Sequence, residues 1–232
     1  MKKSLFLIAA LVTIVSSLIA QDCKNYYYLR NNSEVEMTVY DSKGAIVAKN
    51  LYNVLSVNKE GTGLVSNFTT TVKDEKGKEL SSGKGTVKCD GENLMIDMQM
   101  NMPNIPQLQA MKMETGKAGS FLTYPNNLKV GQTLPEGSFE MNSSANGMDV
   151  TVEYKVANRK VASKEKITTP AGSWDCFKIT TDISISLKMM AMNMPFNLTA
   201  AEWFAPGFGV VKTESYKEGK LVGSMVVTSV KK

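Results

Sequence analysis

The alternation of polar and apolar residues, with a period of two, is the feature that most constrains the fold of this chain. Residues 34–40 read Glu-Val-Glu-Met-Thr-Val-Tyr, with an apolar side chain at every second position. Successive side chains of a strand point to opposite faces, so this repeat predicts β-strands with one buried face. Similar segments recur about every ten residues between turn signals such as Asp-Ser-Lys-Gly at 41–44. The sequence therefore predicts an all-β protein.

The spacing predicts about eleven or twelve strands in an antiparallel meander that forms a barrel-like or half-barrel sheet system. The regular strand spacing is interrupted once, in a stretch bracketed by four prolines: Pro103, Pro106, Pro125 and Pro135. We expect one short helix there, at residues 107–114. The chain then divides into a signal segment (1–20), an N-terminal β half (21–102), a connection (103–135) and a C-terminal β half (136–232).

The first twenty residues are typical of a cleaved secretory signal. Lys2 and Lys3 precede an apolar stretch, small residues follow, and the chain becomes polar at Gln21. The apolar stretch is too short for a membrane span. We expect cleavage near Ala20 and an exported mature protein, soluble in the periplasm or outside the cell.

The complete absence of histidine limits the chemistry available to the chain. Histidine is the usual general base of Ser and Cys hydrolases, and it is a ligand in many zinc and haem sites. We therefore expect a protein that is not an enzyme and holds neither a cofactor nor a metal. The formal net charge is +5, without a run of five like charges, so nucleic acid is not an expected partner.

Three cysteines, Cys23, Cys89 and Cys176, allow three disulfide pairings in an oxidising compartment. We favour Cys23–Cys89, which would tie the mature N-terminus to the first sheet and stabilise the fold by about 4 kcal/mol in the chain-entropy description. A buried free thiol is then expected for Cys176. Asp22 stands before Cys23, where lipid-anchored proteins need a small residue, so a stable membrane anchor is not expected.

Methionine is concentrated in two similar segments, at 98–103 and 190–195. If each segment is a strand, its alternate methionines share one face. If the two strands are also neighbours, one surface carries six thioethers: Met98, Met100, Met102, Met190, Met192 and Met194. Such a surface could pack in the core, hold an apolar ligand, or bind a soft ion such as Cu(I). Trp174 and Trp203 are further ligand candidates, although packed core positions also suit tryptophan.

Two C-terminal segments carry a family resemblance. They are residues 164–179, Lys-Glu-Lys-Ile-Thr-Thr-Pro-Ala-Gly-Ser-Trp-Asp-Cys-Phe-Lys-Ile, and residues 202–216, Glu-Trp-Phe-Ala-Pro-Gly-Phe-Gly-Val-Val-Lys-Thr-Glu-Ser-Tyr. With them the chain resembles exported proteins of the domain-of-unknown-function 3108 type, also called TapB-like, which are frequent in Bacteroidota. The resemblance implies a mostly antiparallel β protein of the cell envelope, without catalytic residues to carry over.

Together these observations predict an exported, non-enzymatic envelope protein. Its Met-lined β face would bind a hydrophobic small molecule or an envelope protein. Two alternatives remain open: a Met-rich protein that binds Cu(I) or Ag(I), and a histidine-free glycan hydrolase that uses paired carboxylates.

Overall fold

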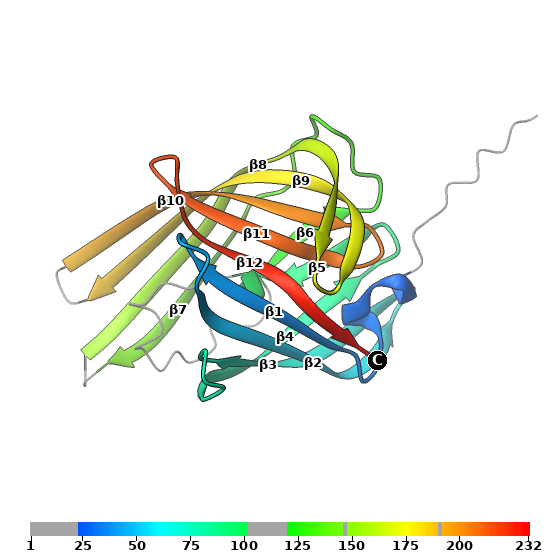
Figure 1. The fold of residues 1–232 in the computed structure, drawn as a ribbon, viewed down its shortest axis with the longest axis horizontal. Helices are drawn as coiled ribbons and strands as arrows, with labels where there is room; N and C mark the ends of the chain where they lie inside the picture. The colour runs from blue at the N-terminus through cyan, green and yellow to red at the C-terminus, as the bar shows by residue number, and fades with distance from the viewer. Residues whose placement is uncertain (1–22, 102–119, 146–147, 190–191) are drawn as a thin grey trace, which may run out of the picture.

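In a computed structural model, the described residues (23–101, 120–145, 148–189 and 192–232) form a twelve-stranded antiparallel sheet (Figure 1). Three short 3-10 helices accompany it: η1 (Cys23–Asn25), η2 (Tyr27–Leu29) and η3 (Met98–Asn101). The strands of the N-terminal half are β1 (Glu34–Asp41), β2 (Ile46–Glu60), β3 (Gly63–Lys73), β4 (Glu79–Cys89), β5 (Asn93–Asp97) and β6 (Phe121–Pro125). Those of the C-terminal half are β7 (Gly137–Ala145), β8 (Met148–Thr169), β9 (Gly172–Met189), β10 (Met192–Ala205), β11 (Gly209–Lys217) and β12 (Lys220–Lys231).

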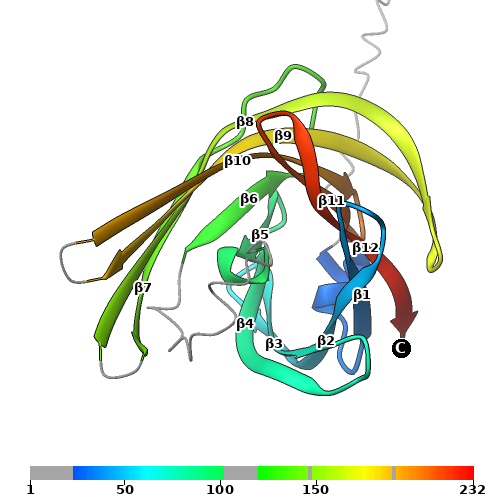
Figure 2. The ribbon, with the colours of Figure 1, turned by 60° about the vertical axis from the view of Figure 1, so that its left-hand side comes forward.

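The sheet consists of two meanders joined by their outer strands. The spatial order is β6-β5-β4-β3-β2-β1-β12-β11-β10-β9-β8-β7, so strands consecutive in sequence are hydrogen-bonded neighbours within each half. β1 pairs with β12 and makes the two halves one sheet. The curvature brings the two end strands, β6 and β7, round to the same side (Figure 2). The expected all-β, barrel-like meander is confirmed.

Aspartate-initiated turns explain several of the hairpins. Asp41 Oδ1 accepts hydrogen bonds from the backbone N–H groups of Lys43 and Ala45, at 2.8 and 2.9 Å. Gly44 in this turn has φ +81°, which glycine adopts without steric cost. Asp74 and Gly77 repeat the arrangement between β3 and β4. Local turn chemistry therefore sets the strand connections.

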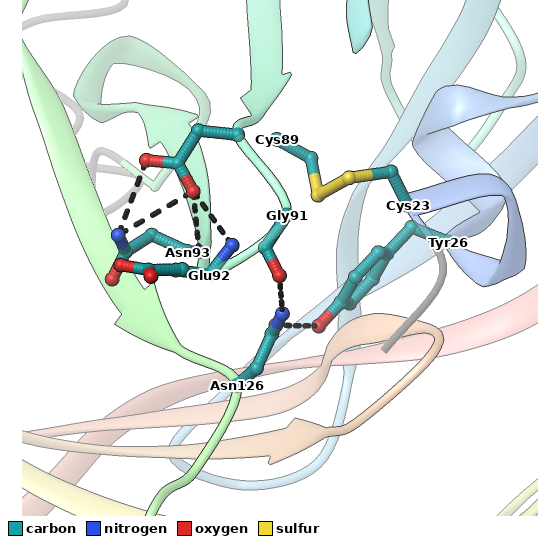
Figure 3. Close-up of a disulfide and its surroundings, with 8 residues drawn as sticks. Cys23, Tyr26, Cys89, Gly91, Glu92, Asn93 and Asn126 are labelled. Atoms are coloured by element: carbon teal, nitrogen blue, oxygen red, sulfur yellow. Dashed lines mark hydrogen bonds between the residues drawn. A yellow bond between two sulfur atoms is a disulfide. The ribbon is translucent and has the colours of Figure 1, made fainter. Parts of the chain in front are cut away.

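The N-terminal segment plugs one end of the curved sheet. Tyr26, between η1 and η2, and Tyr28 and Leu29 of η2 are buried in the core, and Tyr28 meets the rings of Tyr52 and Phe208 edge-on. A disulfide joins Cys23 to Cys89 at the end of β4, which is the pairing favoured from the sequence (Figure 3). The plug is thus held both by covalent linkage and by aromatic packing.

Asn126 fastens the turn that follows Cys89 to this plug (Figure 3). Its Nδ2 donates to the Gly91 carbonyl at 2.6 Å, and its Oδ1 accepts from the Tyr26 hydroxyl at 3.2 Å. One amide side chain therefore connects the disulfide region, the plug and the residue that follows β6.

Two sequence predictions about the centre of the chain have different outcomes. The helix expected at 107–114 lies outside the described residues. The strand expected to run to Met102 instead ends at Asp97, and η3 follows. β6 pairs with β5 from Phe121 opposite Asp97, so the pairing of β5 ends where η3 begins.

Candidate functional site

The β9–β10 hairpin extends beyond β11, which flanks it on the β10 side, whereas β8 pairs with β9 up to Met189. β10 pairs with β9 from Met192 onward, but β11 pairs with β10 only from Thr199 to Ala205. Residues 192–198 of β10 therefore have no β11 partner, and we call them, together with residues 183–189 opposite them on β9, the overhang. The far ends of β7–β10 project past β11, β12 and β1 at the left of Figure 1.

One face of the overhang is apolar. The register places Ile183 opposite Leu198, Ile185 opposite Phe196 and Leu187 opposite Met194. The three β9 side chains are buried. On β10, exposure increases toward the hairpin tip: Leu198 and Phe196 are half-buried, Met194 is 37% exposed and Met192 is 59% exposed. The apolar face thus begins in the core and ends in solvent.

This apolar face continues across β8 to β7. Val152 of β8 lies opposite Leu187, and Tyr154 lies opposite Ile185. Val152 also faces Met141 of β7 in the register of the next pair. The face therefore spans four strands, with its exposed margin on β10.

Proline protects the free edge of the overhang. Pro195 lies in the middle of the β10 segment that pairs with β9 alone, opposite Ser186. A proline in a strand is tolerated where its missing N–H would point to an unpaired edge. It removes a donor that another strand would need, so it disfavours edge-to-edge association.

The predicted methionine residues do not form one surface in the described structure. Met98 and Met100 lie in η3, where Met98 is fully buried, and Met192 and Met194 lie on the overhang. β5, which η3 follows, and β10 are not neighbours in the sheet. The condition that the two Met segments form adjacent strands is therefore not met by Met98 and Met100. Met102 and Met190 lie outside the described residues.

Met98 contributes to packing between the two end strands. A Cβ added to Gly137, the first residue of β7, would lie 2.6 Å from Met98 Sδ. The sulfur therefore occupies the space that a side chain at Gly137 would fill. It packs the start of β7 against the segment that follows β5. This close contact assigns Met98 to the core.

The two tryptophans occupy different packed positions. Trp203 is 4% exposed and donates from Nε1 to Glu165 Oε1 at 2.9 Å. The ammonium groups of Lys178 and Lys212 lie over its ring. Trp174 is half-buried and meets Phe208 with ring centroids 5.0 Å apart. Neither lies on the overhang, so the structure does not bring them together with Met192 and Met194.

A buried polar cluster joins the two halves behind the overhang. Arg159 of β8 is fully buried, and its Nη2 lies 3.2 Å from Glu202 Oε1 of β10. Its Nη1 donates to the carbonyls of Thr123 on β6 and Pro135 before β7, at 3.1 and 2.9 Å. Tyr124 donates to the second Glu202 oxygen at 2.9 Å. One arginine therefore bridges the two end strands and β10.

Burial raises the pKa of Tyr124 well above its ordinary value, and the neighbouring Glu202 charge adds to the shift. The guanidinium of Arg159 lies 4.7 Å from the centre of the Tyr124 ring, which also stacks on Phe204. Within the described residues, Arg159 Nε has no hydrogen-bond partner. Apart from this atom, the charged and hydroxyl groups of the cluster are buried and paired with one another or with backbone carbonyls, which suits a structural role.

Sequence reasoning missed Arg159 because a β-bulge reverses the alternation. Val156 faces the core, so strict alternation would turn residue 159 outward. The register with β9 slips between Ala157 and Lys160, which inserts one extra residue. Asn158 at the bulge has φ +52°, a conformation that asparagine tolerates. An asparagine beside an arginine in a long strand was the available signal.

Among the described residues, no group of three or more Cys, Asp or Glu side chains could hold a metal ion. In the same part of the chain, no helix is long and apolar enough to cross a membrane.

Two solved structures share the fold. A candidate exported protein with a YmcC-like fold from Bacteroides fragilis has a TM-score of 0.73 and 22% identity, over 89% of this chain and 99% of its own. A candidate lipoprotein from Parabacteroides distasonis has a TM-score of 0.74 and 21% identity, over 88% and 97%. A search of curated proteins finds no match.

These likenesses, together with the open twelve-stranded meander, define the class: all-β proteins with a YmcC-like fold. The DUF3108-like family model matches residues 31–227, and the chain belongs to this family. The resemblance found in the sequence is therefore confirmed.

Proposed function

We propose that this protein is an exported, non-enzymatic binding protein that holds an apolar molecule, such as an acyl chain, against the overhang. The observation that carries the proposal is the apolar row on β10, which emerges from the core through Leu198 and Phe196 to the exposed Met194 and Met192. Burying such side chains against an apolar ligand gains about 25 cal/mol for each Å² removed from water.

The two ends of the sheet differ in a way that supports this site. The end near the disulfide is filled by Tyr26, Tyr28 and Leu29. At the opposite end, the β10 row ends at the solvent. Methionine suits a face that accepts ligands of variable shape, because its side chain is flexible and polarizable. Export is supported by the N-terminal signal pattern and by the descriptions of the two structural relatives.

The Cu(I) alternative has less support, because it required the two Met segments to be adjacent strands. The hydrolase alternative requires a solvent-facing carboxylate pair. Glu202 is instead enclosed and bound to Arg159 and Tyr124. Apolar binding is the function that the described geometry favours.

Titration of the mature protein with a fluorescent fatty acid tests the proposal. Met194→Glu places a charge in the apolar row, whereas Asn197→Glu places the same charge on the opposite face of the same strand. We expect Met194→Glu to weaken binding by about tenfold or more, the effect of about 1.4 kcal/mol. Asn197→Glu should bind like the natural protein. Equal affinity in all three proteins would contradict the site.

A further inference from the structure

The convex side of β9–β11 carries a polar depression on the face opposite the apolar row. It has a volume of about 310 Å³, at the lower end of the range for ligand pockets. Its lining residues are Asn158, Lys178, Thr180, Thr181, Asp182, Thr199, Ala200, Ala201 and Tyr216. Asp182 alternates with buried Ile183, and Thr199 with half-buried Leu198, so this surface is separate from the overhang face.

Three side chains form a row across the depression. Asp182 lies opposite Thr199, and Thr199 lies opposite Tyr216, so the row crosses β9, β10 and β11. Neighbouring strands are about 4.8 Å apart, so the row spans about 10 Å. That span matches one or two pyranose rings laid across the strands.

The aromatic end of the row is held in place. The Tyr216 hydroxyl donates to Glu214, two residues earlier on β11, and Glu214 is paired with Lys212. This hydrogen bond within one strand restrains the Tyr216 side chain, which lines the depression. Tyr216 is half-buried, so part of its ring remains accessible. A flat apolar ring beside polar groups suits the mixed surface of a sugar.

The polar end of the row retains free hydrogen-bonding capacity. Asn158 Nδ2 donates to Asp182 Oδ2 at 2.7 Å, which fixes both planar side chains. Among the described residues, Asn158 Oδ1, Asp182 Oδ1 and the Thr199 hydroxyl take part in no side-chain hydrogen bond. These fixed acceptors and the hydroxyl match the donors and acceptors of vicinal sugar hydroxyls.

The charge of the lining favours a neutral ligand. Lys178 and Asp182 are the charged residues of the lining, and their signs cancel. The remaining polar side chains are hydroxyls and one amide, which both donate and accept. We propose that this depression binds a neutral hexose or hexosamine unit of a glycan, with Tyr216 as the stacking platform and Asp182, Asn158 and Thr199 as hydrogen-bonding groups.

Amide chemical-shift mapping by NMR tests the proposal with defined probes. The mature protein is titrated with glucose, galactose, mannose, N-acetylglucosamine and chitobiose, and with inorganic phosphate as the anionic comparison. We expect saturable shifts for at least one neutral sugar, centred on Asp182, Thr199 and Tyr216. Absence of shifts with all five sugars, or shifts with phosphate alone, would overturn the proposal.

Variants separate a sugar site from general surface contact. Tyr216→Ala and Asp182→Ala should each weaken sugar binding by about tenfold, as expected for the loss of one specific contact. Tyr216→Phe keeps the ring and should retain most of the affinity. Ser184→Ala, an exposed position two residues from Asp182 that does not line the depression, is the matched control. Equal weakening by Ser184→Ala would contradict the assigned site.

Discussion

Arg159 of β8 and Glu202 of β10 form a buried ion pair across β9, with 3.2 Å between Nη2 and Oε1. The two strands are not adjacent, so the pair does not reinforce a single hydrogen-bonded strand pair. It instead holds β8 and β10 together across β9 and favours the curved form of the sheet. Arg159 also bonds to the Thr123 carbonyl of β6. The pair therefore holds the end strand β6 against the C-terminal half and supports the base of the overhang.

Removing one member of this pair should destabilise the fold strongly. Glu202→Gln leaves the buried guanidinium without a counter-charge, and such changes cost about 3–5 kcal/mol. Urea unfolding of the mature protein measures the loss. Glu60→Gln makes the same chemical change at the solvent-exposed pair with Lys88 and should cost less than about 1 kcal/mol. Similar costs for both variants would contradict the structural role of the buried pair.

Two glycines of β4 should respond oppositely to alanine. A Cβ at Gly85 would lie 2.1 Å from the buried Phe68 ring, so Gly85→Ala should cost about 1–3 kcal/mol through overpacking. A Cβ at Gly83 meets nothing within 4 Å. Gly83→Ala should leave the free energy of unfolding unchanged or raise it by up to about 1 kcal/mol. Thermal unfolding compares them, and a neutral Gly85→Ala would contradict the packing of Phe68.

The disulfide and the free thiol should be distinguishable by labelling. The Cys23–Cys89 bond closes a long loop, so Cys23→Ser/Cys89→Ser should lower the free energy of unfolding by about 4 kcal/mol. Burial raises the pKa of the Cys176 thiol to about 12. Iodoacetamide should therefore label no cysteine in the native protein and Cys176 alone after unfolding without reductant. Labelling of Cys23 or Cys89 in that unfolded sample would contradict the pairing.

Buried tyrosines should make the fold sensitive to alkali. Burial raises the pKa of Tyr52 to about 12 and also raises that of Tyr28 and Tyr154. Unfolded tyrosines ionise near pH 10. The stabilisation is complete below that value and is lost as the pH rises through the folded-state pKa. Phenolate absorbance followed with near-UV circular dichroism should show ionisation coupled to unfolding above pH 10. Full ionisation near pH 10 with an intact fold would contradict this burial.

The sequence predicted the fold well because its information was local. Alternation at 34–40 and the Asp-x-x-Gly turn at 41–44 correctly define a strand and its hairpin. Two consecutive meanders then leave few ways to arrange the strands. The pairing of β1 with β12, which unites the halves, depends on contacts far apart in sequence and has no local signal.

The candidate site was less accessible to sequence reasoning. Met192 and Met194 do lie together on an apolar face, as alternation within one strand requires. Met98 lies elsewhere because β5 ends at Asp97, and an adjacent strand partner cannot be inferred from composition. Arg159 was missed for a different reason: one extra residue at the bulge beside Asn158 turns Arg159 toward the core, against the alternation that precedes it.

Native mass spectrometry tests most directly whether the overhang holds an apolar molecule. Mature protein purified without denaturant is measured as isolated and after incubation with a long-chain fatty acid, beside Met194→Glu and Asn197→Glu. We predict an adduct of lipid mass on the natural protein and on Asn197→Glu, and a strongly reduced adduct on Met194→Glu. An unliganded mass for the natural protein in both samples, or equal adducts on all three proteins, would contradict binding at the overhang.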